Sequence, residues 1–134
     1  MILVFNRIDA CCLDAEADLS RIRQAGAALY QGSPLHMGLL GARFKDFAID
    51  PPAWLTPAAL EAANRIKTLA DAHGMSLPSL AHRFACAMDA IDRVVLGACN
   101  LPQLRASLDD WRHGPISEEL FDEVCSIISS PGVR

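Results

Sequence analysis

The sequence predicts an α/β fold in which parallel strands alternate with helices. Three short apolar runs, at residues 2–8, 27–31 and 93–97, have the length and the β-branched content of buried parallel strands. Segments with helical spacing of apolar residues separate these runs, and several begin at a capping residue and end at a glycine. The first strand, helix and strand span about thirty residues, which is the size of a βαβ unit.

The first unit is predicted from its boundaries. Ile2–Ile8 is expected to form the first strand, and Ala15–Ala25 a helix that Gly26 ends. Ala27–Gln31 is the second predicted strand. Pro34 follows it and has no N–H to donate to a sheet, so the strand must stop at Ser33-Pro34.

The connection from Ser33 to Thr56 is predicted to be one long loop. Phe44 and Phe47 are expected to be exposed on it, and loops of this length are usually functional or mobile. Gly38 permits a backbone conformation or a close approach that a side chain would block. His36 is interpreted as an exposed loop histidine, with a position facing a ligand pocket as the alternative.

The remaining elements follow in regular order. Capping residues are expected at Thr56, Asn100 and Ser117. The predicted elements are a helix over Pro57–His73, a helix over Ser76–Met88, a strand over Arg93–Gly97, a helix from Leu101 to Trp111 or Arg112, and a helix over Glu118–Ile128.

Composition limits the class of protein. The 134 residues predict a single domain over residues 1–134, with a net charge of −4 and no basic run, which argues against a nucleic-acid partner. No apolar stretch approaches the roughly 20 residues of a membrane span, and the amino terminus lacks signal-peptide features. Five cysteines without a framework spacing indicate reduced thiols and a cytoplasmic location. The apolar fraction of 51% fits either a surface that meets a partner or an alanine- and leucine-rich helical protein.

The strongest local motif for ligand binding runs from Val94 to Asn100. A predicted buried strand ends at Gly97, and a short turn then leads to a capped helix. Free N–H groups and the dipole at such a helix start suit an anion such as a phosphate. Any β/α turn of a parallel sheet has similar features, so this motif alone leaves a purely structural turn as the alternative.

Two motifs together resemble the aldo/keto reductase family. The first is S-P-L-x-x-G-L-L at Ser33–Leu40, and the second is V-x-G-A at Val95–Ala98, followed by Gln103-Leu104. The match is closest to the aldose and galactose dehydrogenase branch. It implies a partial TIM (β/α)8 barrel that comprises the last three strands and their helices, because a complete barrel usually needs about 250 residues.

The resemblance implies a binding site for NAD or NADP. It assigns Ser33 and Leu35 to the pyrophosphate and Gly38 to the adjoining loop. The residues it assigns to the adenosine-phosphate loop are Gly97, Ala98, Cys99 and Gln103. NAD is favoured, because Gly97 and Gln103 stand where many NADP-dependent members carry a lysine or arginine that meets the 2′-phosphate. Binding by this chain alone is expected to be weak or absent.

Three departures from the family pattern concern that site. Gly32 stands where many members place a tyrosine that stacks on the nicotinamide. Ala106 and Ser107 stand where an acidic and an amide residue often contact the adenine.

No catalytic residue is predicted in this chain. The resemblance implies a tyrosine acid with a lysine, an aspartate and a histidine, all from the first half of the barrel. Tyr30 is the only tyrosine, and it lies within a predicted strand. The chain is therefore interpreted as an oxidoreductase by ancestry that is inactive alone. The alternatives are a non-catalytic nucleotide- or phosphate-binding remnant and a structural oligomer.

Histidine and cysteine side chains are the remaining candidates for metal binding and for thiol catalysis. His82 and Cys86 share one helix face and form half a metal site, but no second pair is visible, so no metal is predicted. Cys99 could act as a nucleophile only with a histidine base that the sequence does not identify.

The apolar strands Ile2–Ile8 and Arg93–Gly97 are expected at the sheet edges. They predict a homodimer or a complementary N-terminal half chain as the partner.

Overall fold

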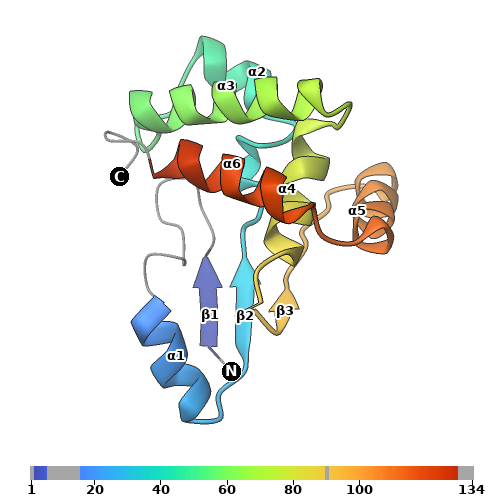
Figure 1. Cartoon of the computed structure of the whole chain (residues 1–134). Helices are drawn as coiled ribbons and strands as arrows, with labels where there is room; N and C mark the ends of the chain where they lie inside the picture. The colour runs from blue at the N-terminus through green and yellow to red at the C-terminus, as the bar shows by residue number, and fades with distance from the viewer. Residues whose placement is uncertain (1, 6–15, 90, 130–134) are drawn as a thin grey trace.

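A small parallel sheet carries the fold. The computed structural model describes residues 2–5, 16–89 and 91–129. Its strands are β1 (Ile2–Phe5), β2 (Leu29–Gly32) and β3 (Arg93–Val94), in the order β1-β2-β3 (Figure 1). Ile2 pairs with Leu29 and Tyr30 with Arg93, both in parallel register. The predicted parallel α/β arrangement is therefore confirmed for these strands.

Helices connect the strands and follow the sheet. They are α1 (Glu16–Gln24), the short 3₁₀ turn η2 (His36–Gly38), α2 (Phe44–Ile49), α3 (Pro57–Ala72), α4 (Leu77–Cys86), α5 (Leu101–His113) and α6 (Glu118–Ile128). The predicted caps are confirmed, because Thr56, Asn100 and Ser117 each accept a hydrogen bond from the N–H three residues on. A side-chain cap of this kind stabilises a helix by about 1 kcal/mol.

The predicted third strand is too long. β3 ends at Val94, and Val95 adds only one more hydrogen bond, from its N–H to the carbonyl of Gln31 at 2.7 Å. The reason lies in β2, which leaves the sheet at Ser33-Pro34 and so offers Leu96 no pairing partner on that side. Residues 6–8 of the predicted first strand lie outside the described residues.

The long connection is more ordered than the sequence predicts. It contains η2 and α2, and Phe47 is buried with its ring 5.6 Å from that of Trp54 in an edge-to-face arrangement. Phe44 is half-buried against the core. The expectation of two exposed aromatics is wrong, because both rings face the helical core rather than solvent.

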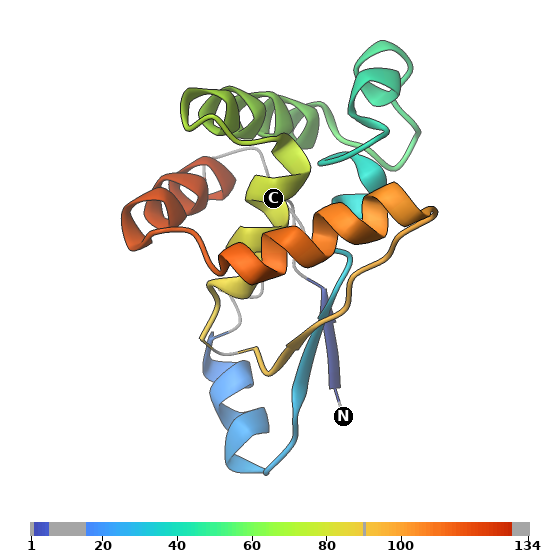
Figure 2. The same cartoon turned by 90° about the vertical axis from the view of Figure 1, so that its right-hand side faces the viewer.

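Most of the buried apolar residues that the structure describes lie between helices and not on the sheet. The larger apolar cluster is formed chiefly by α3, α4 and α6, with Ala63, Leu80 and Val124 among its buried members. A separate small cluster of Leu19, Leu29 and Met88 covers one part of the sheet. Figures 1 and 2 show α3, α4 and α6 beyond the carboxyl ends of the strands and α1 beside their amino ends. The site described below lies where these two parts meet.

In the described part of the chain, the outer edges of the sheet have no further paired strand and one apolar helix face is exposed. β1 and β3 are the outer strands of the described sheet, as predicted. Helix α5 lies at the side of the molecule (Figure 1) and exposes four large apolar side chains at helical spacing: Leu101, Leu104, Leu108 and Trp111. Among the described helices, none is both long and apolar enough to cross a lipid bilayer.

Candidate functional site

A strained turn follows β2 at the carboxyl end of the sheet. Ser33, His36 and Met37 have φ values of 53°, 46° and 58°, and Gly38 has a φ of 94°. A non-glycine residue in the left-handed region costs about 1–3 kcal/mol, and such residues persist only where the surroundings fix them. Strain of this kind concentrates at binding and active sites.

Buried side chains hold this turn in place. The His36 side chain is only 1% exposed, and its ring centroid lies 5.5 Å from that of Trp54. Leu39 and Leu40 follow directly and belong to the main core. The interpretation of His36 as an exposed loop histidine is therefore wrong, because its ring packs beneath the turn.

Gly38 is required by a close approach as well as by its φ value. A Cβ placed on Gly38 would lie 2.8 Å from the Cγ of Arg43. Arg43 is fixed there, because its backbone N–H donates a hydrogen bond to the carbonyl of Gly38 at 3.0 Å. Its guanidinium lies over the ring of Phe47 and contacts the carboxylate of Asp46 at 3.2 Å. The turn thus places a cation at the rim of the site.

The loop between β3 and α5 forms the opposite side. The Asn100 side chain accepts a hydrogen bond from the N–H of Gln103 at 2.9 Å, and the Gln103 side chain accepts one from the N–H of Cys99, also at 2.9 Å. This reciprocal pair resembles a capping box and fixes the loop on the start of the helix. A Cβ placed on Gly97 would meet no heavy atom within 4 Å, so the backbone there faces open space.

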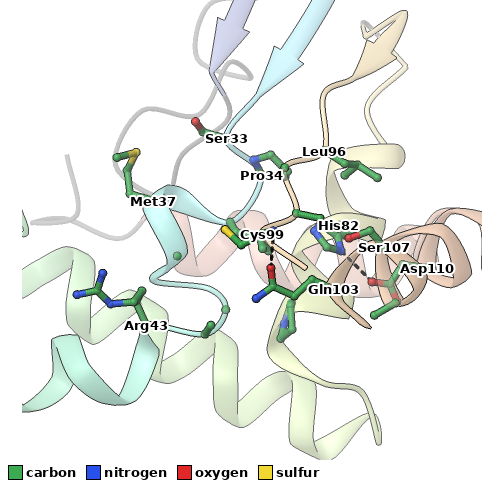
Figure 3. A pocket seen from close by; sticks show the side chains of 18 of the residues that line it. Ser33, Pro34, Met37, Arg43, His82, Leu96, Cys99, Gln103, Ser107 and Asp110 are labelled. Atoms are coloured by element: carbon green, nitrogen blue, oxygen red, sulfur yellow. Dashed lines mark hydrogen bonds and ion pairs between the residues drawn. The ribbon is translucent and has the colours of Figure 1, made fainter. Parts of the chain in front are cut away.

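The two segments enclose one cavity of about 1020 Å³ (Figure 3). Its size matches the upper range of small-molecule sites. Every residue that the family resemblance assigns to cofactor binding lines it: Ser33, Leu35, Gly38, Gly97, Ala98, Cys99 and Gln103. These residues come from two segments roughly sixty positions apart, and the fold brings them to one place. Ala106 and Ser107, at the two adenine-contact positions of the resemblance, line it as well.

The third wall of the cavity contains a polar network that sequence reasoning missed. His82 on α4 is 4% exposed, and its Nδ1 lies 2.8 Å from Oδ2 of Asp110 on α5. The Ser79 hydroxyl donates to Oδ1 of the same carboxylate at 2.5 Å. The sequence identifies His82 only as half of a metal site, and Asp110 gives no signal, because 28 residues separate the two.

The metal and thiol alternatives can be placed in the structure. Among the described residues, no group of three histidine, cysteine or acidic side chains could hold a metal ion. Burial raises the pKa of the Cys86 thiol, and the Asp110 carboxylate raises it further. Cys99 is exposed and lines the same cavity as His82. Tyr30 lies within β2, as predicted.

The cavity lies at the carboxyl ends of parallel strands and beside the start of a helix, which is the edge where open α/β sheets generally bind their ligands. A sequence model of the aldo/keto reductase family matches residues 3–129. The chain therefore belongs to the aldo/keto reductase family, and its ancestry is that of an oxidoreductase. None of the curated protein sequences matches the chain at a significant level.

Proposed function

We propose that this chain is the cofactor-binding part of an aldo/keto reductase, related to the aldose and galactose dehydrogenase branch, and that its cavity takes the phosphates and the adenosine of NAD. The supporting observation is that all seven residues expected to bind the cofactor line one cavity of about 1020 Å³. Family membership supports a nicotinamide dinucleotide as the ligand class. When bound, the nicotinamide of such a dinucleotide supplies hydride exchange with a carbonyl carbon.

The described lining is suited to a dinucleotide that carries a pyrophosphate. Arg43 is the only arginine or lysine among the described lining residues, and it lies next to Gly38 on the turn assigned to the pyrophosphate. Across the cavity, the start of α5 offers the positive end of a helix dipole. A phosphate near Cys99 must compete with the Gln103 side chain for the N–H of Cys99, which favours weak binding by this chain alone.

The lining also favours NAD over NADP. Gly97 and Gln103 carry no charge where many NADP-dependent members have a cation. Arg43 lies beside Gly38 on the opposite turn and not at the α5 loop. A 2′-phosphate at the α5 loop would therefore gain no charge-assisted hydrogen bond from Gly97 or Gln103.

Carbonyl reduction by this chain requires groups from elsewhere. Its single tyrosine, Tyr30, is a half-buried strand residue and is not placed among the lining residues. We therefore propose that a proton donor comes from additional β/α units, carried by another chain or by another part of a longer chain. These units would extend the sheet toward a TIM barrel.

A structural oligomer is the second proposal. The exposed apolar face of α5 supports it, because four large apolar side chains lie at helical spacing on one helix: Leu101, Leu104, Leu108 and Trp111. Faces of this kind usually meet a protein partner. The outer strands β1 and β3 offer further pairing surfaces.

Calorimetric titration with NAD tests the first proposal. Gly97→Phe should abolish binding, because Gly97 lines the cavity and a Cβ there meets no heavy atom within 4 Å, which leaves room for a ring that occupies the cavity. Ala72→Phe is the matched control, since Ala72 is exposed at the end of α3 and lies outside the lining residues. Equal NAD affinity for both variants would place the nucleotide elsewhere, and no binding to the unsubstituted chain would refute the proposal.

A further inference from the structure

The His82 ring is held by a hydrogen bond on one side and lines the cavity described above. Its Nδ1 is bonded to Asp110, whose second oxygen accepts from Ser79. Its Nε2 is buried and has no hydrogen-bond partner among the residues that the structure describes. In Figure 3 the ring lies at the wall of the cavity, and the nitrogen that does not face Asp110 points away from α5.

The chemistry of the partners fixes which nitrogen carries the proton. Asp110 in its ionised form can only accept hydrogen bonds, so Nδ1 must be the donor. In the neutral imidazole, Nε2 then presents a lone pair and no hydrogen. A buried acceptor that lacks a donor is costly, and native proteins rarely leave one unsatisfied. A group that completes the site of the neutral imidazole therefore brings an N–H or an O–H.

We propose that Nε2 of His82 accepts a hydrogen bond from the adenosine half of the bound nucleotide, an inference that rests on the function proposed above. Asp110 lies seven residues after Gln103, which is about 10 Å further along α5 than the phosphate loop. That distance puts the His82 ring beside the nucleoside and not beside the phosphates. The donor is the adenine amine or the ribose 2′-hydroxyl.

His82 would then contribute to ligand specificity, with Asp110 as a positioning residue. Ala106, which lines the same cavity, offers only a methyl group. Asp110 acts through the imidazole, because its carboxylate selects the tautomer that leaves Nε2 free to accept. A ligand without a donor at this point would leave the nitrogen unsatisfied, and it should bind about two- to tenfold more weakly, the range for one neutral hydrogen bond.

Titration with three ligands identifies the donor. We compare NAD with an analogue that lacks the adenine amine and with one that lacks the ribose 2′-hydroxyl, and we expect NAD to bind two- to tenfold more tightly than one of them. The analogue that binds more weakly names the group. His82→Leu should remove this preference, and His82→Gln should keep part of it, because glutamine retains an acceptor. His113→Leu is the matched control, since His113 is exposed at the end of α5.

The tautomer supplies a second measurement. Nitrogen NMR of the free protein should show His82 protonated at Nδ1, and Asp110→Asn should shift the tautomer toward Nε2–H and weaken NAD binding. A preference for NAD that survives His82→Leu, or an Nε2–H tautomer in the unsubstituted chain, would overturn the inference alone. Equal affinity for all three ligands would do the same. If NAD does not bind at all, the proposed function and this inference fall together.

Discussion

Gly38→Ala should lower the free energy of unfolding more than the same substitution at Gly26, Gly41, Gly74, Gly97 or Gly114. The added Cβ would lie 2.8 Å from Cγ of Arg43 and 3.3 Å from its Cβ. Arg43 cannot move away freely, because its backbone N–H donates a hydrogen bond to the Gly38 carbonyl. Alanine must also adopt a φ of 94°, which costs about 1–2 kcal/mol for an L-residue.

Alanine substitutions at Gly26 and Gly97 distinguish the cost of backbone strain from the cost of the close contact with Arg43. Gly26 has a φ of 74° and open space around its Cβ position, so Gly26→Ala should cost only the backbone strain of about 1–2 kcal/mol. Gly97 has open space and no positive φ, so Gly97→Ala should be neutral or should stabilise by about 0.4–1 kcal/mol. Overpacking adds about 1–3 kcal/mol at Gly38, which gives a total of roughly 2–5 kcal/mol.

Urea unfolding followed by circular dichroism measures these differences. The expected order of stability is Gly97→Ala above Gly26→Ala above Gly38→Ala, with an unchanged dependence on urea concentration. Adding Arg43→Ala to Gly38→Ala removes the Cγ atom and should recover most of the overpacking contribution. If Gly38→Ala and Gly26→Ala are equally destabilising, Arg43 moves aside without cost and the close approach has been overestimated.

Four further outcomes are expected. The purified chain alone should not oxidise NADH or NADPH with aldoses or aldehydes, because proton transfer by a positioned acid is worth about 10²–10⁴-fold; steady turnover would contradict this. Calorimetry should show that NADP binds no more tightly than NAD, since Gly97 and Gln103 are uncharged, and a clear preference for NADP would be the opposite result. Sedimentation equilibrium at micromolar concentration should show a dimer that Leu104→Glu weakens, whereas a mass near 14.5 kDa over a hundredfold dilution would show a monomer. Iodoacetamide at pH 8 should modify Cys99 faster than Cys86, because burial raises the pKa of the Cys86 thiol and leaves less thiolate; equal rates by mass spectrometry would refute that reasoning.

The features that sequence predicts well are local ones. Asn100 and Ser117 each cap a helix through a hydrogen bond three residues on, and that bond depends on little beyond the neighbouring residues. Ser33-Pro34 ends a strand for the same kind of reason. The meeting of Ser33 and Gly97 at one cavity was available from the resemblance to a family and not from any local pattern.

The features that sequence missed depend on tertiary contacts. Phe47 and Trp54 build the packing that buries His36, and neither residue signals this in its own segment. Likewise, His82 meets Asp110 only because α4 and α5 pack together, although the two residues lie on separate helices. The length of β3 depends on where β2 ends, which a strand's own composition cannot reveal.

The described apolar core is divided into two clusters. The larger cluster draws its buried residues from positions 39–128, and among the described side chains Leu19, Leu29 and Met88 form the other. The turn at Ser33–Gly38 connects β2, which contributes Leu29 to the smaller cluster, with the helices of the larger one. A ligand bound between this turn and α5 would contact both parts and would stabilise β2 against local opening. Its binding free energy would then be measurable as slower hydrogen exchange in β2.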